Sequence, residues 1–166
     1  MKKWIWISSL FIFGCGTNND YALLVSEHDA ISNINFEILD EPGRAILYWY
    51  LFAYGNECQD SKGLKCKILE KMKIQDECDE NHIAFMEKWV KNNVLMQYKL
   101  QKCPNLPYNF AVKNIIEKID LHRHRDTITM RFKVRGINAL AEKSWNIDQT
   151  AAYLVDGDSV IQLSVK

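Results

Sequence analysis

The sequence predicts an α+β fold, in which N-terminal helices pack on one face of a C-terminal antiparallel sheet of four or five strands. Residues 45–54 are apolar or aromatic at every position and are followed by Gly55-Asn56, which is typical of a buried helix and its end. Beyond the prolines of 104–107, apolar residues recur at every second position, which is the period of strands. Helices followed by a meander indicate helices on one face of the sheet.

Residues 1–14 are expected to be a leader that is removed before folding. Lys2 and Lys3 precede the uncharged stretch 4–13, and small residues follow it at 14–16. A helix of ten residues is only about 15 Å long, roughly half of a bilayer's hydrocarbon core, so it does not span a membrane. A basic start, a short apolar run and small residues at the end are the pattern of a secretory signal peptide.

The end of this leader, "IFGC", resembles the lipobox of bacterial lipoproteins, in which a small residue precedes an invariant cysteine. The resemblance implies that Cys15 becomes the first mature residue and carries diacylglycerol and an N-acyl chain of the palmitate type. Several acyl chains are enough for stable anchoring in a membrane. In this family an Asp after the cysteine retains the protein at the inner membrane. Gly16 stands there instead, so the resemblance implies anchoring in the outer membrane, facing the periplasm.

The mature chain is expected to be one domain behind a short polar tether. Removal of 1–14 leaves 152 residues, enough for a proper core. We place the lipidated cysteine and tether at 15–20 and the domain at 21–166, with helices over about 40–93 and the β meander over about 108–166. The mature chain carries 19 basic and 21 acidic side chains. That balance argues against a nucleic-acid binder and against a polybasic membrane-surface module.

The remaining cysteines are expected to form two disulfides. They are Cys58, Cys66, Cys78 and Cys103. An even set in an oxidising compartment favours disulfides, and these gaps do not match the C-x₂₋₄-C spacing of structural zinc sites. A helix over 80–92 and a returning strand over 94–101 would be roughly 20 Å and 26 Å long. Of the three possible connectivities, we therefore expect Cys78–Cys103, with Cys58–Cys66 closing a short loop.

The helical part contains one well-marked helix and several shorter elements. In the helix over 40–54, Asp40 is the expected N-cap, and a proline at the second following position is tolerated in the first turn. Before it, 21–34 is expected to contain a short helix. After it, 62–74 is expected to form a second short helix.

A third helix is expected to begin after Asp79 and to end at Asn92-Asn93. It places one apolar stripe on the core, formed by Ile83, Met86, Trp89 and Val90. The following stretch, 94–101, is expected to be either a strand or a continuation of the helix, and its alternation slightly favours the strand.

Four strands are expected over 110–121, 127–136, 143–155 and 159–165. In the second of them, apolar residues alternate with threonine and basic residues, so one face is expected to be core and the other solvated. "DGDS" at 156–159 is expected to be a hairpin turn.

This order of elements resembles the cystatin-like and nuclear-transport-factor-like α+β folds, some of which occur in secreted bacterial lipoproteins. The resemblance covers roughly residues 40–165 and includes the closing "YLVDGDSVIQL" hairpin. It carries no catalytic motif, and the cysteine-bearing insert at 56–80 is not part of the pattern. It therefore implies a fold and leaves the function open.

The stretch "DLHRHRD" is the one candidate for metal chemistry. If it is extended, Asp120, His122, His124 and Asp126 share one face. Two imidazoles with flanking carboxylates can bind zinc or copper. The stretch also joins two strands and contains two arginines, which favours a solvated hairpin end without metal. No metal or other cofactor is therefore assigned, and His122 and His124 remain the candidates for one.

Aromatic residues of the 40–54 helix are the candidates for recognition. Trp49 and Phe52 are expected in the core, whereas Tyr48, Tyr50 and Tyr54 are candidates for a ligand or partner surface, because tyrosine combines contact area with a polar tip. The sequence contains no nucleophile elbow, phosphate loop or dinucleotide fingerprint.

We therefore expect a lipid-anchored, non-enzymatic binding module for an envelope protein or an apolar ligand. A narrower form is an immunity or inhibitor protein against a periplasmic toxin or hydrolase. The alternative is a small metal-binding protein or a hydrolase-type enzyme that uses the His/Asp cluster of 120–126.

Overall fold

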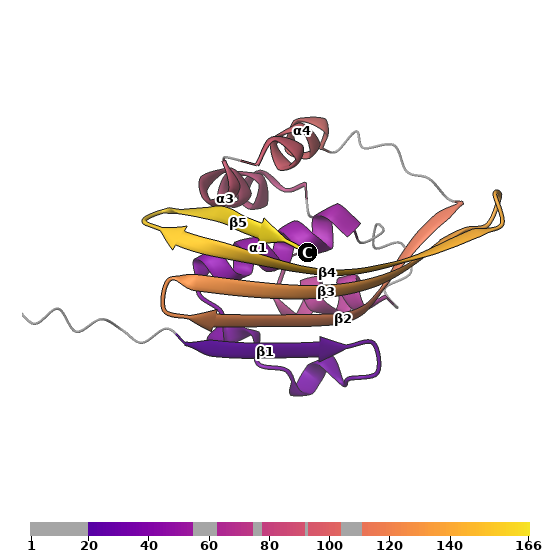
Figure 1. Ribbon diagram of the computed structural model, residues 1–166, viewed down its shortest axis with the longest axis horizontal. Coiled ribbons are helices and arrows are strands. Elements are labelled where there is room, and N and C mark those ends of the chain that lie inside the picture. The colour runs from indigo at the N-terminus through magenta and orange to yellow at the C-terminus, as the bar shows by residue number, and fades with distance from the viewer. Residues whose placement is uncertain (1–19, 55–62, 75–77, 92, 104–110) are drawn as a thin grey trace, which may run out of the picture.

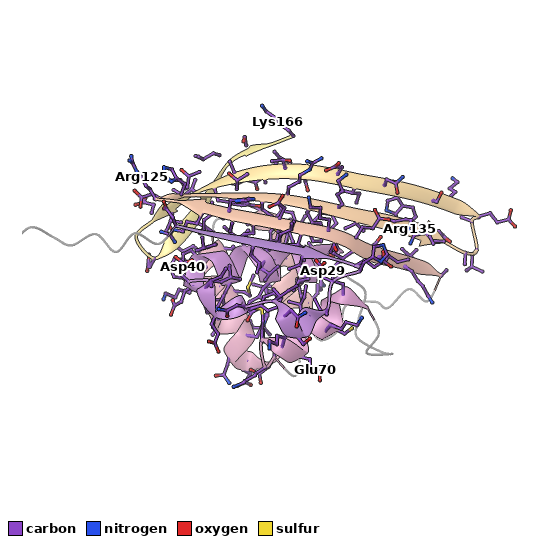
Figure 2. The ribbon with its side chains drawn as sticks, turned by 90° about the horizontal axis from the view of Figure 1, so that it is seen from below. Asp29, Asp40, Glu70, Arg125, Arg135 and Lys166 are labelled. Atoms are coloured by element: carbon purple, nitrogen blue, oxygen red, sulfur yellow. A yellow bond between two sulfur atoms is a disulfide. The ribbon has the colours of Figure 1, made fainter. Side chains whose placement is uncertain are left out.

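The sheet and the helices form two layers, as the sequence predicts. The computed structural model describes residues 20–54, 63–74, 78–91, 93–103 and 111–166. All helices lie on one face of a five-stranded antiparallel sheet with the order β1-β2-β3-β4-β5 (Figures 1 and 2). The strands are β1 (Tyr21–Ser26), β2 (Val112–His124), β3 (Thr127–Asn138), β4 (Lys143–Asp156) and β5 (Ser159–Val165). The helices are η1 (Ile31–Asn33), η2 (Phe36–Ile38), α1 (Glu41–Tyr54), α2 (Leu64–Lys71), α3 (Glu80–Val90) and α4 (Val94–Lys102).

Helix α1 is the centre of the helical layer. Asp40 caps its start, because its Oδ1 accepts a hydrogen bond from the backbone N–H of Gly43 at 3.1 Å. Every residue from Ala45 to Phe52 is buried. The helix packs on β2 and β3 on one side and on α3 on the other. This double contact explains why the whole circumference of α1 is apolar.

Helices α3 and α4 begin at side-chain caps. Asp79 accepts from the N–H of Asn81 at 2.9 Å, and Asn93 accepts from the N–H of Met96 at 3.0 Å. The expected start of α3 is confirmed, and so is the second short helix, which is α2. The strand favoured for 94–101 is wrong. Asn93 begins a separate helix, α4, rather than only ending the one before it.

The expected short helix in 21–34 is also wrong over its first part. Residues Tyr21–Ser26 form β1, the fifth strand of the sheet, which pairs antiparallel with β2 from Tyr21↔Arg123 to Ser26↔Lys118. Leu23 and Val25 point into the core and Leu24 is exposed. Strand alternation was therefore present, but it covers too few residues to be told from a helix without its partner.

The β2–β5 meander follows the predicted alternation. On β3, Ile128, Met130, Phe132 and Val134 are buried against the helices. The opposite face is polar, with Arg131 and Lys133 of β3 both in ion-pair contact with Asp148 of β4. The expected hairpin at 156–159 is confirmed, and Gly157 supplies the positive φ of +57° that its turn requires.

Candidate functional site

Two of the three candidate tyrosines, Tyr50 and Tyr54, form hydrogen bonds within the fold. Tyr50 is only 2% exposed, its hydroxyl accepts from Tyr153 at 3.1 Å, and its ring lies 5.0 Å from that of Phe132. Burial raises the pKa of Tyr50 and, more strongly, that of Tyr153, so both phenols stay neutral. Tyr54 is half-buried and donates to Gln149 at 3.0 Å. A partner-surface role therefore does not fit Tyr50, and the polar tip of Tyr54 is already engaged.

Tyr48, the third candidate tyrosine, lines a cavity. Its ring lies 5.0 Å from that of His82 and 5.9 Å from that of Phe85, both on α3. Together with Arg44, these side chains line a cavity of about 500 Å³ between α1, the end of α2 and the start of α3.

The His/Asp cluster does not converge on one point. His122 Nε2 lies 2.5 Å from Asp120 Oδ1, whereas His124 Nδ1 lies 3.1 Å from a different carboxylate, that of Asp20. Arg125, in the turn that follows β2, also donates its N–H to Asp20 at 2.8 Å. In the part of the chain that the structure describes, no three His, Cys, Asp or Glu side chains are grouped as a metal site. The two histidines thus contact different carboxylates at one end of the sheet, where Figure 2 places Arg125.

The structure contains the predicted Cys78–Cys103 disulfide, with the two Cα atoms 5.5 Å apart. It joins the start of α3 to the end of α4 and holds the two helices as a pair. Cys66 on α2 is also disulfide-bonded. Its expected partner, Cys58, and the expected lipidation site, Cys15, lie outside the described residues.

A second hollow lies beside the last strand of the sheet, where sequence reasoning assigned no site. Figure 1 shows α3 and α4 on the β5 side of the sheet, and α3 contacts β5. We call this hollow the β5–α4 groove. It is a cavity of about 360 Å³ lined by Ile46, Trp49, Val90, Asn93, Val94, Tyr153, Val160, Ile161 and Gln162.

Both α4 and β5 carry exposed apolar side chains, and two of these, Val94 and Ile161, line the β5–α4 groove. On α4, Val94 is 84% exposed, and Leu95 and Tyr98 are more than half exposed. On β5, the exposed apolar side chains are Ile161, Leu163 and Val165. The exposed side chains of Val94 and Ile161 thus place apolar surface on both sides of the hollow, where a partner can cover it.

The chemistry of this groove suits a polypeptide. Strand β5 pairs with β4 on one side and is the last strand of the sheet, so its other edge presents backbone N–H and C=O groups. From Ser159 to Val165 it has no charged side chain, proline or glycine, the devices by which edges are usually blocked. The sequence signal was present in "VLMQYKLQ", whose apolar residues exceed what one buried helix face needs.

The chain matches no protein-family model, and no curated protein or solved structure matches it significantly. The likeness to bacterial lipoproteins and to cystatin-like folds therefore stays a prediction from the sequence. Among the described residues, no helix is long and apolar enough to cross a membrane.

Proposed function

We propose that this chain is a lipid-anchored, non-enzymatic binding module of the bacterial envelope that captures an extended segment of a partner protein at the β5–α4 groove. The proposal rests on the uncharged edge of β5, which lies beside Val94, the exposed first residue of α4. A strand added to such an edge gains main-chain hydrogen bonds, while pockets for alternate side chains give specificity.

The two walls of the groove would contact different parts of the added strand. Its backbone would pair with β5, and every second side chain would turn toward the helices. Those side chains would meet Val94, and one of them would enter the 360 Å³ cavity.

The charges of α4 indicate which kind of partner segment can bind. Helix α4 carries Lys99 and Lys102 and no acidic residue, and β5 is uncharged. A segment with an apolar centre and acidic flanks complements these walls, whereas a basic segment would be repelled. We therefore expect the partner to be a protein with an exposed apolar strand bordered by Asp or Glu.

Lipid anchoring at Cys15 would localise the binding of the partner to the cell envelope. Lipid at Cys15 would hold the domain at the outer membrane through the tether of 16–20, with partners reaching it from the periplasm. Cys15→Ser is expected to release the protein from the membrane fraction or to leave it as an unprocessed precursor. A Cys15→Ser protein that is cleaved to mature length and still sediments with membranes contradicts the anchor.

The narrower form of the proposal is an immunity or inhibitor protein. A small disulfide-bonded domain can neutralise an incoming periplasmic toxin or hydrolase by occupying an exposed strand of it. Protection of the cell from a toxin, lost together with binding at the groove, would distinguish this role from assembly of a resident envelope complex.

The experiment is affinity capture of the tagged, lipidated protein from solubilised envelopes, with groove variants and matched controls in parallel. Leu163→Lys places a charge on the β5 edge, and Leu24→Lys does the same on the opposite edge strand at equal exposure, 57% against 56%. Val94→Asp alters the α4 wall, and Leu140→Asp is its control in the β3–β4 turn, at 84% and 87% exposure.

A stoichiometric protein that is lost with both groove variants and kept with both controls supports the proposal. Amide hydrogen exchange on the complex should then show new protection in β5. Capture that is equal in all four variants, or a partner bound without protection of β5, overturns the assignment of the groove. Association of the chain with itself through β5 would replace the foreign partner by a second copy.

A further inference from the structure

We propose a second binding site, independent of the β5–α4 groove: the cavity beside Tyr48 takes a small amphiphilic carboxylate, whose carboxylate pairs with Arg44 and whose apolar body packs on Tyr48 and Phe85. We call it the Tyr48 cavity. It is lined by Arg44, Tyr48, Lys73, Ile74, Asp79, Asn81, His82 and Phe85. Its volume of about 500 Å³ lies within the usual range for sites that hold small molecules.

Arg44 provides the first argument. Its Nε is shielded from solvent, yet among the described residues it has no hydrogen-bond partner. Buried donors of native proteins are nearly always satisfied, and an unsatisfied one calls for a missing acceptor. A guanidinium presents its donors in a planar fork that fits a carboxylate with two parallel hydrogen bonds.

Local charge favours an anion over a neutral acceptor. Among the described residues, the ionisable side chains that line the cavity besides Tyr48 are Arg44, Lys73, Asp79 and His82. Asp79 is already used, because it caps α3 through the N–H of Asn81 at 2.9 Å. The start of α3 also contributes the partial positive charge of a helix N-terminus. In the described part of the lining, two cations therefore face one engaged carboxylate.

The apolar walls argue against a simple inorganic anion. Tyr48 and Phe85 meet edge to face, with their planes at 69°, and Ile74 also lines the cavity. Burial raises the pKa of the Tyr48 hydroxyl, so this wall stays neutral at physiological pH and does not repel an anion. A ligand with an apolar chain or ring beyond its carboxylate uses both kinds of wall.

A larger hollow continues from the same arginine. A cavity of about 1010 Å³ between η1, η2 and α2 shares Arg44 and Lys73 with the Tyr48 cavity. Its further lining includes Lys67, Lys71 and Glu70, and Figure 2 shows Glu70 on the side of the helical layer away from the sheet. Arg44 therefore lies where an anion can arrive from the open hollow and turn its apolar end toward Tyr48.

Calorimetric titration of the mature domain with three eight-carbon probes tests the proposal. Octanoate carries the carboxylate, octan-1-ol has the same chain without charge, and octylammonium reverses the charge. We expect saturable binding of octanoate that is at least tenfold tighter than that of either other probe. Equal affinity for octanoate and octan-1-ol, or no saturation by octanoate at millimolar concentration, overturns the proposal.

Variants assign the binding to named residues. Arg44→Gln is expected to weaken octanoate at least tenfold and octan-1-ol less than twofold, whereas Arg131→Gln, on the far face of the sheet, changes neither. Phe85→Ala should weaken both probes. If Arg44→Gln proves unfolded by circular dichroism, Arg44→Lys keeps the charge without the fork and should lose octanoate affinity about tenfold. Unchanged octanoate affinity in a folded Arg44 variant refutes the role of this residue.

The two sites can fail separately. Leu163→Lys should leave octanoate binding intact, and Arg44→Gln should leave protein capture intact. Loss of octanoate binding on Leu163→Lys would show that the two sites are not independent and would overturn this proposal.

Discussion

Replacing Asp40 tests whether one carboxylate joins the helical layer to the sheet. Its Oδ1 accepts from Gly43 N–H at 3.1 Å and from the Tyr21 hydroxyl of β1 at 3.0 Å. Its Oδ2 accepts from the guanidinium of Arg123 on β2, whose side chain is buried. Figure 2 shows Asp40 between the two layers. The residue predicted as an N-cap is therefore also the counter-ion of a buried cation.

Asp40→Asn separates these roles, because the amide oxygen can still cap α1 but the negative charge is gone. Leaving one member of a buried ion pair without its partner costs about 3–5 kcal/mol of unfolding free energy. The Asp40 side chain is 25% exposed, so we expect the lower end, about 3 kcal/mol. Asp40→Ala also removes the cap and should cost about 1 kcal/mol more.

Urea unfolding at constant m-value measures these differences. Adding Arg123→Met to Asp40→Asn should recover much of the loss, because no uncompensated charge then remains buried. An Asp40→Asn protein within about 0.5 kcal/mol of the wild type would refute the reasoning, since surface changes fall in that range. So would a double variant that is as unstable as the sum of the two single ones.

Three further changes address other parts of the fold. Cys103→Ser, which opens a disulfide with a sequence separation of 25, should lower the unfolding free energy by about 3–4 kcal/mol. Reductant should destabilise the wild type by more than it destabilises the variant, in which only the disulfide of Cys66 is left to open. Gly43→Ala should lower the unfolding free energy by about 1–2 kcal/mol, although alanine favours helices, because its Cβ would overlap the Tyr21 hydroxyl. An increase in melting temperature would contradict this expectation. Hydrogen bonds from Arg131 and a neighbouring lysine hold the pKa of Asp148 at about 2, below its ordinary 3.8. The folded state should therefore lose stability as the pH falls from about 4 to 2. Asp148→Asn should flatten that part of the curve of unfolding free energy against pH.

Sequence reasoning succeeded where a signal was local and repeated. The uniformly apolar α1, the capped start of α3 and the alternation of β3 each contain enough residues to establish a period. The Cys78–Cys103 pairing was reached from element lengths, although α4 proved to be a helix of about half the length expected of a strand. The predicted pairing is still correct, because the chain reverses direction at Asn93 and α4 packs back along α3.

Sequence reasoning failed where the contact that decides the structure joins residues far apart in the chain. Six residues of "YALLVS" fit either a strand or a helix, and only their pairing with β2 decides. The site residues show the same limit. An all-apolar helix does not reveal which tyrosine meets β4 and which meets α3, so Tyr50 and Tyr48 were grouped together although they lie on different sides of α1.

The partner of β1 has a consequence for the order of folding. Strands β2 to β5 pair with their neighbours in the chain, whereas β1 pairs with residues roughly a hundred positions later. Closing so long a loop costs entropy before any contact offsets it, so we expect β1 to dock late, onto a meander that has already formed. Until the second half of the chain has emerged from the ribosome, the N-terminal segment has no strand to join. That delay leaves Tyr21–Ser26 without a pairing strand for most of the time that the chain is being synthesised.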